Sequence, residues 1–214
     1  MSRQITREQF KAAAGVAEWR LMYDGPTAFF RTPSMAEGAA LASTIGALDG
    51  MAGIDAAVDL RADGVTVRLS WYSGMTEQHV SLAQRISATA HQAGAEPDAS
   101  RLQVVQVTVD ALSIPDVVAF WRAVLDYHEI GDDDLIDPRG RGPMVWFQDM
   151  DAPRRQRNRM HVDLSLPLAE AEARVKAALA AGGTLVSDAH APMWWTLADP
   201  EGNEVDIAAH PDLV

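Results

Sequence analysis

The sequence predicts an α+β protein made of two consecutive domains, and three observations support this prediction. The chain has 214 residues, which at about 150 residues per domain corresponds to one or two domains. Glycine, proline and small polar residues gather at positions 94–101, as is typical of a linker. The pattern of apolar residues differs on the two sides of this segment. We therefore place the domains at residues 1–97 and 102–214, joined by a linker at 98–101.

The composition limits the possible partners and location of the chain. Apolar residues make up 48% and charged residues 22%, which is typical of a folded globular protein. The net charge of −12 repels phosphate backbones and argues against a nucleic-acid partner. The chain has no cysteine, which excludes disulfides, thiolate metal sites and a cysteine nucleophile. Its first residues do not resemble a signal peptide and no apolar run reaches about 18 residues, so we expect a cytoplasmic protein without a membrane partner.

The first domain reads as αββαββα, an antiparallel sheet with helices on one face. Thr6 and Thr76 are candidate N-caps of the first and third helices, and Asp63-Gly64 is a turn signal between two strands. His79 and His91 lie on the third helix, where we expect them on the surface. The expected helices cover 6–19, 35–48 and a stretch from 77 through 90, and the expected strands cover 20–31, 56–60 and 65–72.

The second domain reads as two successive βαβββ units. Gly182-Gly183 is the expected stop of its second helix. The first unit is expected to have strands at 102–109, 128–136 and 143–148, with a helix at 116–125. The second is expected to have strands at 160–166, 184–187, 194–198 and 204–208, with a helix at 168–181.

The second domain contains three motifs: Ala119-Phe120-Trp121 with Val124-Leu125, then the run Asn158-Arg159-Met160-His161-Val162-Asp163-Leu164, and finally Asp199-Pro200-Glu201-Gly202-Asn203-Glu204. With these motifs, residues 102–209 resemble the glyoxalase-like branch of the vicinal-oxygen-chelate superfamily. The resemblance implies a cavity formed by both βαβββ units, in which two side chains from each unit hold a divalent metal.

The first domain resembles the fold of pterin-4a-carbinolamine dehydratases. The likeness lies in Phe10 and Trp19, the Ala-rich second helix, Gly74-Met75-Thr76, Leu82-Ala83 and Ile86. That family carries a paired His-His-Pro, where this chain has Gly50-Met51-Ala52-Gly53-Ile54-Asp55, and a further His where this chain has Trp71-Tyr72. Proton transfer near neutral pH needs a group that titrates there. We therefore expect a domain without dehydratase activity that serves dimerisation, walls a cleft or binds a ligand.

The resemblance also implies the metal ligands of the second domain. By register these are Gln106, Gln148, His161 and Asp206. Only the imidazole and the carboxylate are strong ligands for a divalent ion, since two neutral amides do not offset its charge. Such a set would hold Mg²⁺, Mn²⁺ or Fe²⁺ loosely, or none. His161 and Asp206 are also the candidate acid–base groups, and a purely structural role for His161 within the sheet remains open.

Aromatic and basic side chains are the candidates for contact with an organic ligand. In each of the pairs Trp146-Phe147 and Trp194-Trp195 we expect one ring in the core and the other beside a pocket, which makes Trp146, Trp194 and Trp195 candidates. Arg159 ends the basic run at 154–159, which is either a solvated loop or a clamp on an anion.

Two functions follow from these residues. The first, which two glutamines among the ligands favour, is a metal-free pocket that binds an aromatic or drug-like molecule by sequestration or non-redox acid–base chemistry. The second is a metal-dependent lyase, isomerase or dioxygenase of the superfamily. In both cases the expected partner is a small molecule, and the expected assembly is a homodimer.

Overall fold

The computed structural model describes residues 2–131, 134–153 and 160–210, and these form two compact units. The N-terminal unit spans Met1–Val104 and the C-terminal unit spans Val105–Val214. The division falls a few residues after the expected linker at 98–101. Glu96–Pro97 form the short strand β5, which pairs with β2, and Ala99–Arg101 form a 3₁₀ turn, η2. The segment rich in glycine and proline is therefore ordered by contacts within the N-terminal unit.

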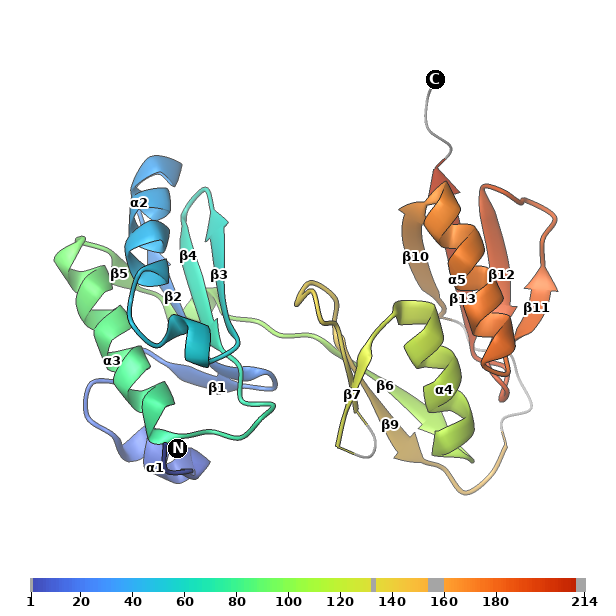
Figure 1. Cartoon of the computed structure of the whole chain (residues 1–214), viewed down its shortest axis with the longest axis horizontal. Coiled ribbons are helices and arrows are strands. Elements are labelled where there is room, and N and C mark those ends of the chain that lie inside the picture. The colour runs from blue at the N-terminus through green and yellow to red at the C-terminus, as the bar shows by residue number, and fades with distance from the viewer. Residues whose placement is uncertain (1, 132–133, 154–159, 211–214) are drawn as a thin grey trace. The chain divides into compact units, whose positions relative to one another are not determined.

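The N-terminal unit is an antiparallel sheet with helices packed on one face, as Figure 1 shows for α2 and α3. The strands that make up the path of the sheet run in the order β1-β2-β4-β3. Its helices are α1 (Arg7–Ala12), α2 (Met35–Gly46) and α3 (Glu77–Gln92), with a 3₁₀ turn η1 at Met51–Gly53; its other strands are β1 (Arg20–Met22), β2 (Gly25–Arg31), β3 (Ala56–Arg61) and β4 (Gly64–Leu69).

Two local expectations for this unit are wrong. The first helix ends at Ala12 instead of reaching residue 19, because Ala13 is extended and Gly15 adopts a left-handed φ of 74°. The turn between β3 and β4 consists of residues 62 and 63, while Gly64 already pairs with Arg61 as the first residue of β4. A Cβ at Gly64 would lie 2.4 Å from the Phe29 ring, so the glycine is required by a close approach within the sheet and not by the turn.

The C-terminal unit contains two halves with the same order of elements: strand, helix and three strands. The first half has β6 (Gln106–Ala111), α4 (Ile114–Leu125), β7 (His128–Ile130), β8 (Asp134–Ile136) and β9 (Met144–Asp149). The second half has β10 (Val162–Pro167), α5 (Leu168–Ala180), β11 (Thr184–Ser187), β12 (Trp194–Ala198) and β13 (Glu204–His210). The single strand expected at 128–136 is thus a pair of antiparallel strands, β7 and β8.

Each half forms a four-stranded mixed sheet, with the orders β6-β9-β8-β7 and β10-β13-β12-β11. The pairs β6–β9 and β10–β13 are parallel, and the other pairs are antiparallel. Alternate residues of these strands face a hydrophobic core that takes side chains from both halves, among them Phe120, Phe147, Leu197 and Ile207. The remaining residues of each strand lie on the opposite face, which we call the open face of each sheet.

Helices α4 and α5 contact each other and cover the core side of the unit. Val117, Phe120, Trp121 and Val124 of α4 are buried, with the spacing of one helical face. None of the helices that the structure describes is both long and apolar enough to cross a membrane.

Candidate functional site

The open face of the second sheet in the C-terminal unit brings one histidine and two aspartates together. Strands β10 and β13 run in parallel, and in their register Asp163 lies directly opposite Asp206. His161 immediately precedes β10 and lies two residues before Asp163, so both side chains fall on the same face of the strand. The parallel pairing of β10 with β13 therefore brings Asp206 to His161 and Asp163, which are neighbours in the sequence.

The three side chains are close enough to share one small cation. His161 Nε2 lies 3.5 Å from Asp163 Oδ1 and 3.6 Å from Asp206 Oδ2. One ligand atom from each residue lies within 4.8 Å of those of the other two. The side chains of His161 and Asp163 are 42% and 70% exposed, and that of Asp206 is 21% exposed. The site is therefore open to solvent on the histidine side and anchored on the Asp206 side. We call these residues the His161 triad.

Asp206 is held in place from the neighbouring strand. Thr196 pairs with Asp206 across β12 and β13, and its hydroxyl donates a 2.6 Å hydrogen bond to Asp206 Oδ1. The other carboxylate oxygen, Oδ2, is the one that lies near His161. This arrangement fixes the carboxylate and leaves one of its oxygens directed at the triad.

An aromatic pair lies on the same face of this sheet. Trp194 precedes Thr196 by two residues on β12, so the two side chains share the open face. The His190 ring stacks on Trp194 with its centroid 4.0 Å away and its plane inclined by 21°. Trp195 points the other way and packs against the hydrophobic core, so it does not line this surface with Trp194.

The two glutamines predicted as metal ligands on the first sheet lie too far apart to bind the same ion. Gln106 pairs with Met144 at the start of β9, whereas Gln148 pairs with Asp110 near the end of β6. The two glutamines are therefore four residues apart in register, or about 13 Å along the strands. Trp146 shares their open face and is 39% exposed, whereas its neighbour Phe147 is buried, as expected for this pair. Arg159 lies outside the described residues.

Asp163 is the member of the triad that the sequence analysis missed. A strand that contains one candidate ligand places the residue two positions away on the same face, and this signal was present in the run His161-Val162-Asp163. The glyoxalase-like resemblance implied ligands at Gln106, Gln148, His161 and Asp206, and Asp163 is not one of these positions. One imidazole and two carboxylates match the donor types that Mn²⁺, Fe²⁺ and Zn²⁺ accept, and the two negative charges would offset that of the ion.

The motif at residues 199–204 has a structural role in this unit. Asp199 is buried and accepts hydrogen bonds from Trp121 Nε1 and from the backbone N–H groups of Glu201 and Asn203. Gly202 adopts a left-handed φ of 88°, which the turn requires. The Glu201 carboxylate accepts the backbone N–H groups of residues 112 and 113, at 2.7 to 2.9 Å, just before α4 begins. The turn therefore joins the two βαβββ halves.

The N-terminal unit uses its histidines differently from the expectation. His79 is 3% exposed, so the prediction that it lies on the surface is wrong. Its Nδ1 accepts the Thr76 backbone N–H at 3.1 Å, and its Nε2 lies 2.9 Å from the Ser70 carbonyl oxygen. The imidazole thus links the start of α3 to the end of β4. His91 is exposed and pairs with Glu18.

Comparison with known proteins supports a glyoxalase-like assignment for the C-terminal unit. Residues 106–208 match the family model of the glyoxalase-like domain. No curated protein matches the chain.

Several solved structures are similar to about half of the chain. A glyoxalase/bleomycin resistance protein/dioxygenase family enzyme from Burkholderia phytofirmans is 19% identical, covers 49% of this chain and 95% of its own, and has a TM-score of 0.37. A glyoxalase-related enzyme from Fulvimarina pelagi is 17% identical over 50% of this chain and 88% of its own, with a TM-score of 0.41. A mutant of the fosfomycin resistance protein FosX from Listeria monocytogenes, complexed with Mn(II) and a dihydroxypropylphosphonic acid, is 11% identical over 50% of this chain and 88% of its own, with a TM-score of 0.41.

Proposed function

We propose that the C-terminal unit, in which residues 106–208 are a glyoxalase-like domain, binds a divalent cation at the His161 triad and uses it to bind a small oxygen-containing molecule. The observation that supports this proposal is the convergence of one imidazole and two carboxylates within 4.8 Å on an open sheet face. The expected reaction class is that of a lyase, isomerase or dioxygenase.

Each residue of the triad would supply one ligand atom to the cation. His161 Nε2 and Asp206 Oδ2 would supply two ligand atoms, and Asp163 Oδ1 a third from the same strand as the histidine. Thr196 keeps Asp206 oriented, so that this carboxylate does not need to reorganise when the site is filled. A bound divalent cation would supply Lewis acidity toward oxygen atoms of the small molecule.

Solvent exposure on the His161 and Asp163 side leaves room for a ligand. Because Asp206 is largely covered by the sheet and Asp163 is not, a small molecule would approach from the side of β10. Asp163 is the more exposed of the two carboxylates, so it is the one that such a molecule would reach first and that could accept a proton from it.

The experiment is a titration of the metal-free full chain with Mn²⁺, followed by the loss of the electron paramagnetic resonance signal of free Mn²⁺. We expect one site per chain, and at least about tenfold weaker binding in His161→Ala, Asp163→Asn and Asp206→Asn. Asp116→Asn is the matched control, because it removes the same charge from the first turn of α4. Absence of stoichiometric binding, or equal weakening in the control, would overturn the proposal.

A second candidate function is metal-free binding of an aromatic molecule, and the stacked pair His190–Trp194 favours it. A planar ligand could pack beside this pair on the open face, with the triad as a polar contact. In the presence of a chelator, saturable binding of a planar probe such as naphthol that is lost in Trp194→Leu and retained in Trp146→Leu would support this function over the first.

A further inference from the structure

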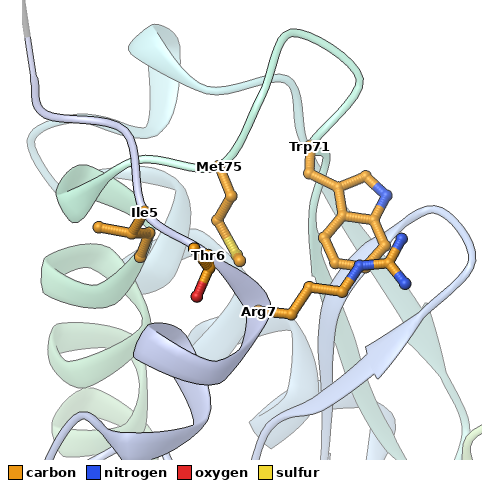
Figure 2. A pocket seen from close by; sticks show the side chains of 5 residues that line it. All are labelled: Ile5, Thr6, Arg7, Trp71 and Met75. Atoms are coloured by element: carbon orange, nitrogen blue, oxygen red, sulfur yellow. The ribbon is translucent and has the colours of Figure 1, made fainter.

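A small pocket lies in the N-terminal unit, apart from any residue of the His161 triad. It has a volume of about 290 Å³ and is lined by Ile5, Thr6, Arg7, Trp71 and Met75. Figure 2 shows that Arg7 extends from the start of α1 toward the Trp71 ring, while Ile5 and Met75 lie on the other side of the pocket. The lining thus combines one cation with apolar surfaces.

Arg7 differs from the other arginines of this unit in its partners. Its guanidinium carbon lies 4.5 Å from the centroid of the Trp71 ring. Among residues 2–104 it is the one arginine for which the structure shows no oxygen partner. The others contact a carboxylate or a backbone carbonyl: Arg3, Arg20, Arg31, Arg61, Arg68, Arg85 and Arg101. In a chain with a net charge of −12, a guanidinium without such a partner is an available site for an anion.

The Trp71 ring keeps Arg7 in position for this role. Trp71 Nε1 donates a 2.9 Å hydrogen bond to the Tyr23 carbonyl oxygen, which fixes the ring. The guanidinium carbon lies over the ring, as in a cation–π contact. A guanidinium carries its five N–H donors in its own plane, so contact with the face of a ring leaves N–H groups that can donate to an anion.

The rest of the lining favours an organic anion. Ile5 is partly exposed and packs against the core, and it presents most of the apolar surface, to which Met75, at 6% exposure, adds a small part. None of the five lining residues is acidic, and Arg7 is the single cation among them. One guanidinium matches the charge and the two oxygens of a carboxylate. A volume of about 290 Å³ lies just below the range for small-molecule sites, which is roughly 300–1,000 Å³, so the pocket fits only a small ligand.

We propose that this pocket binds a small planar carboxylate, an aromatic acid of one or two rings. The carboxylate accepts hydrogen bonds from the N–H groups of Arg7, and the rings pack against Met75 and Ile5. This site does not depend on the function proposed for the C-terminal unit, since it contains none of the same residues.

The test uses the isotope-labelled full chain and naphthoate as the probe. Nuclear magnetic resonance follows the indole N–H signal of Trp71, which is assigned by its disappearance in Trp71→Phe. We expect a saturable shift of this signal, and binding at least about tenfold weaker in Arg7→Gln, because a charge-assisted hydrogen-bond pair is lost. Arg7→Lys, which keeps the charge but not the two-pronged geometry, should fall between the two.

Arg61→Gln is the matched control, because Arg61 is a well-exposed arginine paired with Asp59 on another surface. It should bind naphthoate as wild type does, and the uncharged naphthamide should bind wild type at least about tenfold more weakly than naphthoate. Arg7 is exposed, so an otherwise unchanged spectrum of Arg7→Gln is expected and establishes that this variant is folded. No saturable shift, equal binding of naphthamide, equal weakening in Arg61→Gln, or equal affinity for inorganic phosphate would each overturn the proposal.

Discussion

The two units of the chain put a histidine to opposite uses. In the N-terminal unit, His79 is buried and both of its ring nitrogens lie within hydrogen-bond distance of protein groups, at Thr76 and Ser70. In the C-terminal unit, the side chain of His161 is 42% exposed and faces two carboxylates at 3.5 and 3.6 Å, beyond direct hydrogen-bond range. The same side chain is thus a structural link in one unit and available for chemistry in the other.

This difference indicates that the hydrogen bonds of the ring nitrogens identify a histidine that is available for function. Both residues lie at an edge of regular structure, His79 in the first turn of α3 and His161 just before β10. What separates them is whether the ring nitrogens are already used by the backbone. A histidine with both nitrogens occupied has no atom left for a metal or a substrate, whereas His161 has Nε2 near two acceptors that a cation would draw together.

The largest expected effect is the loss of stability on removal of His79. If this loss were absent, His79 and His161 would not differ in the way described. His79→Ala should lower the free energy of unfolding of the N-terminal unit by about 2–4 kcal/mol, because it leaves a cavity and removes one buried and one part-buried hydrogen bond. His161→Ala should change the stability of the metal-free chain by no more than about 0.5 kcal/mol. Urea unfolding followed by circular dichroism measures both.

His91→Ala is the control for this pair, because His91 lies on the same helix as His79 and is exposed. It should change stability by less than about 1 kcal/mol. A loss in His161→Ala as large as that in His79→Ala would mean that His161 is also structural, and the triad would lose its place as the candidate site.

A smaller effect is expected at Glu201, whose side chain links two parts of the C-terminal unit by hydrogen bonds, as His79 does in the N-terminal unit. Its carboxylate accepts the backbone N–H groups of Leu112 and Ser113. Glu201→Ala should destabilise the unit by about 1–3 kcal/mol, since these donors lose a charged acceptor at the start of α4. Glu170→Ala, an exposed change in the first turn of α5, should cost less than about 1 kcal/mol. Equal losses at the two positions would show that Glu201 does not join the two halves.

Thr196→Val tests whether the orientation of Asp206 matters for cation binding at the His161 triad. It removes the hydroxyl that orients Asp206 but leaves every proposed ligand in place. We expect Mn²⁺ binding to weaken by about tenfold, with little change in stability, because outer partners of metal ligands typically contribute this much. Ser165→Ala, on the same face of β10, is the control and should leave Mn²⁺ affinity unchanged. Unchanged affinity in Thr196→Val would show that Asp206 does not depend on this hydrogen bond.

Much of the fold was predictable because it follows local patterns. Apolar residues at helical spacing predicted α3 and α4, and alternation predicted β4 and part of β6. The errors arose where a tertiary contact decided the outcome. The close approach of Phe29 requires Gly64 within the strand, and a left-handed Gly15 follows the early end of α1.

The site was only partly predictable, for a physical reason. Register between β10 and β13 decides that Asp163 faces Asp206, and register is a property of strand pairing that a single sequence does not state. His161 and Asp206 were predicted from the glyoxalase-like resemblance. The match at residues 106–208 confirms the resemblance, and the roles of the two residues stay a prediction. The pocket at Arg7 was not predicted, because it needs α1 and the end of β4 to meet in space.

The smallest effect on stability near neutral pH is expected from the ionisation of Tyr72. This residue follows Trp71, and the pair stands where the dehydratase family carries a histidine. Burial, aided by the nearby Asp24 carboxylate, raises the pKa of Tyr72 to about 12. A tyrosine whose folded pKa lies above its unfolded value of about 10 contributes stability that is fully present below pH 10 and is lost as the pH rises through 12. The ultraviolet absorbance of tyrosinate should therefore show a transition near pH 12 that Tyr72→Phe removes and Tyr23→Phe retains. Because the phenol stays protonated at neutral pH, Tyr72 does not offer a base in place of the absent histidine. Ionisation of Tyr72 near neutral pH would reopen acid–base chemistry in the N-terminal unit and remove the contrast with His161.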